Sequence, residues 1–128
     1  KVNDSMPEYV LAKISSIMNE KGLTDFKRVG IYGLTYKENV DDFRESPTLQ
    51  MLEHQNSHLA EPLKVFDPFV KNKIVSSQVF DFDAFLDSVD IVVIMVKHDH
   101  IKNNFDKLKN KIVFDCCNIY SGKNVYKL

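Results

Sequence analysis

The hydrophobic positions of this chain change their spacing near residue 28, from a helical period to short, almost continuous apolar runs. Such runs predict buried strands, here at Val29–Tyr32, Leu63–Phe66, Ile91–Val96 and Ile112–Phe114. The segments between them have spacing and end signals typical of helices, at Pro47–His54, Asp83–Ser88 and Asn103–Lys109. We also expect a short extra strand at Val79–Phe80 and an edge strand at Asn124–Leu128.

The alternation of strands and helices predicts the fold class. Successive β-α-β units with right-handed connections form an α/β, doubly wound, mainly parallel Rossmann-like sheet with helices on both faces. The fully apolar run Ile91–Val96 agrees, because a strand covered on both faces has no polar side. If the strand order is 3-2-1-4, the first and fourth strands are neighbours. Residues 33–37 then face Asp115–Asn118 across the crevice where such sheets bind ligands.

The residues before the sheet predict an N-terminal connector helix. Ser5 and Glu8 have the spacing of a capping box, and Gly22 can end the helix. Apolar side chains recur at helical spacing and form one stripe: Met6, Val10, Ile14, Ile17 and Met18. This stripe packs either on the same domain or on a neighbouring one.

Composition and charge narrow the class of partner. The 128 residues are 44% hydrophobic and 27% charged, and the formal net charge is −1. Without a positive field the chain is not expected to bind nucleic acid or a membrane surface, so any anion site must be local. No apolar run approaches a membrane span, and no signal peptide is visible. The start without Met indicates a fragment of a larger protein, and the adjacent Cys116 and Cys117 indicate a reduced, cytoplasmic setting.

One connection is unusually long and polar. It runs from Gly33 to Pro47, reads GLTYKENVDDFRESP, and ends in a Ser N-cap followed by Pro at the first helical position. Connections from strand to helix usually take about 2–6 residues, and longer ones tend to be functional. The density of charged groups predicts that this loop binds an anion. Gly30 and Gly33 do not complete a G-x-G-x-x-G fingerprint, so the sheet is not expected to hold NAD by itself.

Three side chains of this loop are candidates for binding. Lys37 can reach a phosphate or a uracil carbonyl as a mobile positive charge, and a solvated lysine is the alternative. Tyr36 can stack on a base or ribose, or pack in the core. Arg44 has acidic neighbours on both sides, which favours an internal salt bridge that orders the loop. A bidentate grip on phosphate is compatible with that bridge.

The other polar motifs are expected to be structural. Asp67 ends the second strand and precedes a proline, which favours a turn over a ribose contact. The run His98-Asp99-His100 has no placed third ligand, so we prefer a surface loop to a zinc site. Cys116 and Cys117 have no adjacent base and are expected to be buried structural thiols. We assign no metal site and no catalytic residue within the chain.

The loop Gly33–Pro47, the upstream Asn3–Pro7 and the later Val65–Pro68 resemble the UDP-glucose/GDP-mannose dehydrogenase family. The loop is most similar to that of bacterial UDP-N-acetyl-mannosamine and UDP-N-acetyl-glucosamine dehydrogenases of capsule and surface-polysaccharide synthesis. The resemblance implies that residues 1–25 are the end of a central dimerisation helix and that residues 26–128 form a C-terminal UDP-binding domain. It also implies a homodimer or higher homo-oligomer in the full-length protein.

The resemblance further implies the chemistry. Members oxidise the C6 alcohol of a UDP-sugar to a uronate in two NAD-dependent steps, through a thioester on a Cys that neither Cys116 nor Cys117 matches. By position, Tyr36 and Lys37 hold the nucleotide-sugar, and Arg44 reaches NAD bound mainly by an N-terminal domain. Cys117 stands where the family commonly has Arg. The chain alone is therefore predicted to be catalytically silent. The alternative is a non-catalytic nucleotide-binding or assembly module, which binds UDP-type ligands or binds a partner through the apolar helix stripe.

Overall fold

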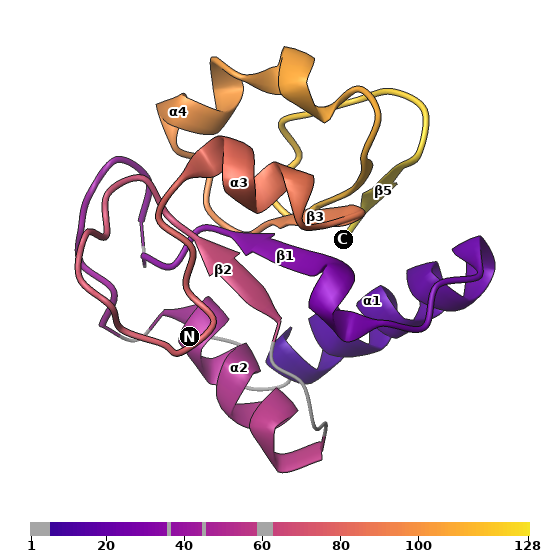
Figure 1. Ribbon diagram of the computed structural model, residues 1–128, viewed down its shortest axis with the longest axis horizontal. Helices are drawn as coiled ribbons and strands as arrows, with labels where there is room; N and C mark the ends of the chain where they lie inside the picture. Colours follow the sequence, from indigo (N-terminus) through magenta and orange to yellow (C-terminus); the bar gives the residue numbers. More distant parts are fainter. Residues whose placement is uncertain (1–5, 36, 45, 59–62) are drawn as a thin grey trace.

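The computed structural model describes residues 6–35, 37–44, 46–58 and 63–128. Along the chain the elements are α1 (Met6–Lys21), η1 (Phe26–Arg28), β1 (Val29–Tyr32), α2 (Pro47–His58), β2 (Lys64–Phe66), α3 (Phe82–Asp87), β3 (Ile91–Ile94), α4 (Asp99–Lys102), η2 (Phe105–Leu108), β4 (Ile112–Asp115) and β5 (Val125–Lys127). In these ranges the strands form one sheet in the order β2-β1-β3-β4-β5, and every pairing is parallel. Helices α1 and α2 cover one face and α3 and α4 the other (Figure 1). The predicted α/β class and the preceding helix are confirmed.

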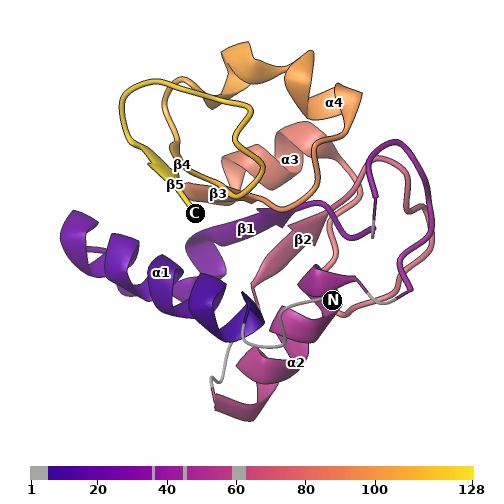
Figure 2. The same cartoon turned by 180° about the vertical axis from the view of Figure 1, so that it is seen from behind.

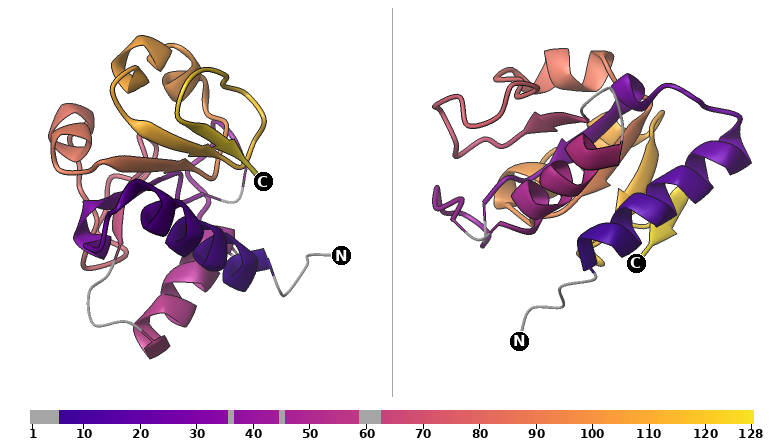
Figure 3. Two further views of the ribbon diagram at one scale, coloured as in Figure 1. Left: turned by 90° about the vertical axis from the view of Figure 1, so that its right-hand side faces the viewer. Right: turned by 90° about the horizontal axis from the view of Figure 1, so that it is seen from below.

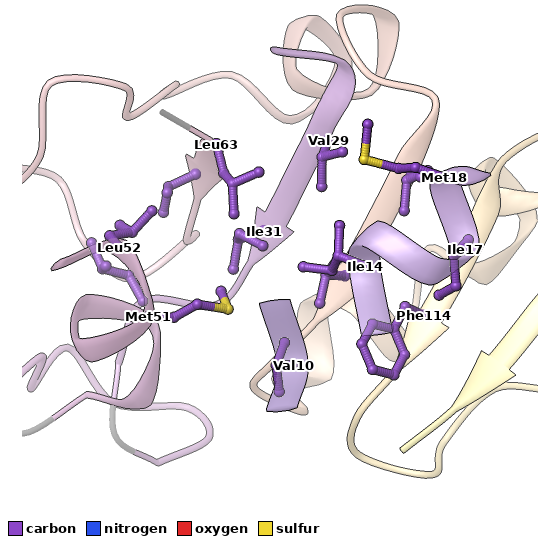
Figure 4. Close-up of a cluster of buried hydrophobic side chains, with 14 of the residues drawn as sticks. Val10, Ile14, Ile17, Met18, Val29, Ile31, Met51, Leu52, Leu63 and Phe114 are labelled. Atoms are coloured by element: carbon purple, nitrogen blue, oxygen red, sulfur yellow. The ribbon is translucent and has the colours of Figure 1, made fainter. Parts of the chain in front are cut away.

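The face under α1 and α2 carries the larger hydrophobic cluster. Val10, Ile14 and Ile17 of α1 are almost completely buried against the sheet (Figure 4). Met51 of α2 joins them, and the two helices lie next to each other across this face (Figure 3). The apolar stripe of α1 therefore packs on this domain, which decides between the two partners that the sequence left open. The helix ends at Gly22, whose positive φ of 72° is the conformation expected of a glycine C-cap.

Helix α3 packs on the opposite face of the sheet, away from α1 and α2 (Figure 2). A Cβ built on Gly30 of β1 would lie 2.6 Å from the Phe85 ring of α3, so only glycine lets α3 pack this closely over β1. The chain leaves β2, passes over β1 within α3, and enters β3 on the far side of β1. None of the helices in the described ranges has the length and apolar character needed to cross a membrane.

The predicted strand order 3-2-1-4 is wrong. β1 pairs with β2 on one side and with β3 on the other, and β4 pairs with β3 and β5. Both orders satisfy right-handed crossover connections, so hydrophobic periodicity does not distinguish them. The edge strand expected near the C-terminus is confirmed as β5.

Two element predictions also need correction. The helix expected over Asn103–Lys109 is replaced by the short α4 and by η2, because the Asn104 side chain donates to the carbonyl of His100 (2.7 Å) and interrupts a continuous helix. The extra strand expected at Val79–Phe80 is reduced to an isolated parallel bridge between Val65 and Gln78.

Candidate functional site

The carboxyl ends of β1 and β3 define the crevice of this sheet. The chain leaves β1 toward α2 on one face, and it leaves β3 toward α4 on the other. Doubly wound sheets bind ligands where neighbouring strands diverge in this way. The crevice lies beside β1, as predicted from the sequence, but the strand next to β1 there is β3 and not the predicted β4.

A pocket of about 190 Å³ opens at this crevice. Its described lining comes from three loops that follow three strands: Lys37 and Glu38 after β1, Met95, Val96 and Lys97 after β3, and Cys117 after β4. Lys37 and Cys117 thus line the same pocket. This confirms the expectation that the long loop and the turn with the two thiols meet at one place.

Gly33 allows the loops after β1 and β3 to approach each other. Its φ is 108°, and a Cβ at this position would lie 2.7 Å from the backbone nitrogen of Val96. The Gly33 N–H also donates to the carbonyl of Phe66 at 2.9 Å. A side chain here would push the two loops apart, so Gly33 is required both for its conformation and for its small size.

The far end of the long loop is tied back to its beginning. Ser46 caps α2, because its Oγ accepts from the N–H groups of Thr48 (3.1 Å) and Leu49 (3.3 Å). Thr48 Oγ1 in turn donates to the carbonyl of Gly33 at 2.6 Å. The predicted N-cap is confirmed, and it closes the base of the loop that carries Lys37.

The pocket lining favours an anion. Two lysines face one carboxylate, so the described lining is net positive. Burial raises the pKa of Cys117 to about 11, so this thiol is neutral at physiological pH. Burial also raises the pKa of Cys116. The pocket can therefore bind a negative group and lacks a thiolate nucleophile, as expected for structural thiols.

Lys97 is the lining residue that the sequence analysis missed as a candidate. It lies in the loop that follows β3, and β3 neighbours β1 only in the observed strand order. The sequence does show a lysine just after a fully apolar run. That lysine can be recognised as a pocket residue only when the strand is known to lie beside β1.

Asp67 holds the start of the long loop. Its Oδ2 accepts from the N–H groups of Leu34 (2.7 Å) and Thr35 (3.1 Å), and its Oδ1 accepts from the N–H of Phe69 (2.8 Å). Burial by itself would raise the pKa of this carboxyl. Hydrogen bonds from His98 and from the backbone outweigh burial and keep the pKa below its ordinary value. The structural role predicted for Asp67 is confirmed.

Asp115 plays the same part for the turn that carries Cys117. Its carboxylate accepts from the N–H groups of Cys117 (2.9 Å), Ile119 (2.7 Å) and Tyr120 (2.7 Å). Lys127 of β5 forms an ion pair with it at 2.8 Å. Burial opposes the charged form, but Lys127 and the backbone donors still lower the pKa of Asp115. The cysteine turn is thereby fixed to the end of β4.

The segment His98-Asp99-His100 is not the surface loop that we expected. His98 is fully buried, with Nε2 2.9 Å from Asp67 Oδ2, and Asp99 and His100 belong to α4. His100 Nδ1 lies 2.9 Å from the hydroxyl of Tyr32. Among the described side chains, no three of the His, Cys, Asp and Glu type converge as metal ligands would. His98 points inward because the buried carboxylate of Asp67, at the end of β2, and the N–H of Asn39, after β1, both form hydrogen bonds with its ring.

Arg44 has the salt bridge that its neighbours predicted. Its Nε lies 3.0 Å from Asp42 Oδ1 and its terminal nitrogen 2.9 Å from Asp42 Oδ2. This bidentate contact lowers the pKa of Asp42 to about 2, and the Arg44 side chain is 83% exposed. Arg44 is not among the described residues that line the pocket. Tyr36, the third candidate, lies outside the described residues.

Comparison with known proteins identifies close relatives of this architecture. The model of the UDP-glucose/GDP-mannose dehydrogenase family, UDP binding domain, matches residues 30–122. The UDP-N-acetyl-D-mannosamine dehydrogenase of Methanocaldococcus jannaschii is 36% identical over 127 residues, which cover 93% of this chain and 28% of that protein. The NDP-N-acetyl-D-galactosaminuronic acid dehydrogenase of Ralstonia nicotianae is 28% identical and is matched over 98% of this chain and 30% of its own.

A solved structure agrees with these sequence matches. The UDP-N-acetyl-mannosamine dehydrogenase of Staphylococcus aureus superimposes with a TM-score of 0.75 and 32% identity. The match covers 98% of this chain and 31% of that one. The chain therefore spans about 30% of the length of the relatives that it matches.

Proposed function

This chain belongs to the UDP-glucose/GDP-mannose dehydrogenase family, and we propose that it is the UDP-binding part of an NAD-dependent nucleotide-sugar 6-dehydrogenase. The substrate class that we propose is a UDP-N-acetyl-hexosamine, or a UDP-hexose, whose C6 alcohol is oxidised to a uronate. Relatives named for UDP-N-acetyl-mannosamine support the first of these. Capsule or other surface-polysaccharide synthesis in the cytoplasm is the setting that goes with this substrate.

The observation that carries the proposal is the positive pocket at the crevice between β1 and β3. Pockets that enclose a whole small ligand usually measure roughly 300–1,000 Å³. The pocket here measures about 190 Å³ and is open, so it can hold the diphosphate of a nucleotide-sugar but not the whole molecule. The remainder of the ligand must lie against another surface. This agrees with a chain that provides only some of the substrate contacts of the full-length enzyme.

We assign the residue roles as follows. Lys37 and Lys97 bind the diphosphate from the carboxyl ends of two neighbouring strands, as mobile charges that need no fixed geometry. Tyr36 holds the uridine part by stacking. Arg44, ordered by Asp42, reaches NAD from outside the pocket. Binding energy from the diphosphate then positions the sugar C6 for oxidation elsewhere in the enzyme.

The residues of this sheet do not fit NAD as a resident cofactor. Asp67 stands where dinucleotide-binding sheets place the acid that contacts the ribose, but both of its oxygens are occupied by donors of the protein itself. The fingerprint glycines are also absent. We therefore propose that NAD is bound mainly by a different domain, and that this chain alone catalyses no oxidation.

For the domain division we keep residues 1–25 as the end of a central helix and residues 26–128 as the UDP-binding domain. A homodimer or higher homo-oligomer built on that helix is part of the proposal. One form of the non-catalytic alternative binds a partner through the apolar stripe of α1. That stripe is buried in the core of the same domain, which disfavours this form of the alternative.

Titration of the chain with UDP, followed by calorimetry, tests the proposed function. We expect Lys37→Ala to weaken UDP binding by roughly tenfold, the loss expected when one charge-assisted contact to phosphate is removed. Lys109→Ala, an exposed lysine that precedes β4 at the other end of the sheet, is the matched control. UDP bound no more tightly than uridine, or equally well by Lys37→Ala, contradicts the assignment.

A further inference from the structure

The backbone around Lys37 is held at two points, one on each side. On the N-terminal side, Thr35 N donates to Asp67 Oδ2 (3.1 Å), and Thr35 Oγ1 donates to the carbonyl of Lys37 (2.8 Å). On the C-terminal side, Asn39 N donates to His98 Nδ1 at 2.8 Å. Lys37 itself is exposed, so these anchors, and not packing, set where its side chain starts.

The hydrogen bonds of His98 define its protonation state. Nδ1 accepts the N–H of Asn39, so Nδ1 carries no proton. Nε2 lies 2.9 Å from the Asp67 carboxylate and therefore carries the proton and donates it. The ring is fully buried beside Phe69 and Tyr32, with centroid distances of 4.8 and 6.0 Å. A second proton would have to enter at Nδ1, where it would meet the Asn39 N–H, so protonation and loop anchoring exclude each other.

Asn39 is itself fixed in an uncommon conformation. Its φ is 59°, the left-handed region that asparagine tolerates better than most residues. Its Oδ1 accepts the N–H of Asp99 at 2.9 Å, so the loop is bonded to both His98 and the first residue of α4. The geometry on this side of Lys37 thus depends on the segment that follows β3.

Titratable side chains pack against His98 from the ends of two strands. The Asp67 carboxylate lies 2.9 Å from Nε2, and the Tyr32 ring lies 6.0 Å from the imidazole between ring centroids. The Tyr32 hydroxyl is bonded to His100, so Asp67 is the charged partner of Nε2.

We propose that His98 is a positioning residue for nucleotide binding: as the neutral Nε2–H tautomer, backed by Asp67, it clamps the loop on the C-terminal side of Lys37 and directs that lysine into the pocket. The proposal rests on the proposed function, since Lys37 must bind the diphosphate. On the C-terminal side of Lys37, Asp67 acts through its hydrogen bond with His98. On the N-terminal side, Asp67 itself accepts the N–H of Thr35.

A nitrogen NMR spectrum of the histidine rings tests the clamp without any ligand. We expect His98 to show a protonated Nε2 and an unprotonated Nδ1 near neutral pH, and slow amide exchange at Asn39 despite its exposed position. A protonated Nδ1, or an Asn39 amide that exchanges as fast as a free loop amide, overturns the proposal.

Binding of UDP-glucose at one neutral pH tests the consequence. His98→Gln keeps one acceptor for the Asn39 N–H and one donor for Asp67, so we expect it to bind about as tightly as the wild type. His98→Phe fills the site without hydrogen bonds, and we expect it to bind about tenfold more weakly.

The outcomes separate this inference from the proposed function. A wild-type chain that binds no UDP-glucose refutes the proposed function, and the role in nucleotide binding falls with it. His98→Phe that binds as tightly as the wild type, or His98→Gln that binds as weakly as His98→Phe, overturns the inference alone. If His98→Phe does not fold, the exchange rate of the wild-type Asn39 amide carries the test. A rate as fast as that of a free loop amide then contradicts the clamp.

Discussion

Two buried aspartates organise the site from beneath. Asp67 and Asp115 stand at the carboxyl ends of β2 and β4, and each collects backbone N–H groups from a loop that lines the pocket. Neither reaches the ligand side, because their oxygens are used inside the protein. At the scale of single residues, the two aspartates fix the backbone of the pocket loops, and the exposed Lys37 and Lys97 provide the positive charge of the pocket.

The two carboxylates make the protein sensitive to acid. The folded pKa of each lies below the unfolded value of about 3.9, so the unfolded state binds more protons between the two values. Stability is therefore fully present above about pH 4 and is lost as the pH falls through the folded pKa. We expect Asp67→Asn and Asp115→Asn each to lower the free energy of unfolding by about 2–3 kcal/mol at neutral pH.

Urea unfolding at a series of pH values measures this effect, with Asp87→Asn on the exposed end of α3 as the control. Each buried variant should also lose stability less steeply on acidification than the wild type. An acid dependence in Asp67→Asn identical to that of the wild type contradicts the assignment for that carboxyl.

Lys97 and Cys117 give a second prediction at this scale. Because Cys117 lines the pocket as a neutral thiol, Cys117→Arg adds a positive charge beside the proposed diphosphate position. We expect Lys97→Ala to weaken UDP binding about tenfold, and Cys117→Arg to restore most of it in the double variant. Calorimetric titration of the two single variants and the double variant provides the comparison. A double variant no better than Lys97→Ala shows that Lys97 does not act through charge in this pocket.

At the scale of elements, α1 is the least expected contributor. It precedes the sheet in the chain, yet Ile14 is fully buried and lies among residues from α2 and the sheet. A helix that merely connected domains would not need this burial. The element that precedes the domain in sequence therefore belongs to its core in space.

We expect Ile14→Ala to lower the free energy of unfolding by about 2–5 kcal/mol, because a buried cavity forms where the side chain was. Ser16→Ala, on the exposed side of the same helix, is the control and should change stability by less than about 0.5 kcal/mol. Chemical denaturation measures both. A loss below about 1 kcal/mol for Ile14→Ala indicates that α1 is only loosely attached.

At the scale of the whole molecule, the pocket is open and small, and its net positive charge is the property that favours ligand binding. No described side chain near it is an activated nucleophile, and Asp67 is committed to the loop. The pocket thus offers positive charge to a phosphate-bearing ligand, and the proposed function assigns the oxidation to residues outside this chain.

We therefore expect the chain alone to produce no NADH from NAD and a UDP-sugar, even at protein concentrations where UDP binding is measurable. Absorbance of NADH, with a full-length relative as the positive control, gives the answer. Turnover by the chain alone, abolished by substitution of Cys116 or Cys117, would contradict both the proposed division of labour and the structural role of these thiols.

Much of this architecture follows from local chemistry, which the sequence carries. Apolar runs specify strands because burial on both faces removes their polar side, and Ser46-Pro47 specifies a helix start because its groups satisfy free N–H donors. The charged loop and the candidate role of Lys37 were visible in the same way. So was Asp67 as a structural acid, because Asp before Pro favours a turn.

The strand order, the burial of His98 and the position of Lys97 in the pocket were decided only by the tertiary structure. An apolar run indicates that a strand is buried, but it does not indicate which strand lies next to it. That choice depends on α3 crossing over Gly30, a contact between residues more than fifty positions apart. Because β3 lies beside β1, Lys97 and Lys37 line the same pocket, and His98 forms a hydrogen bond with Asp67. The site is therefore formed by packing between distant segments and not by any single motif.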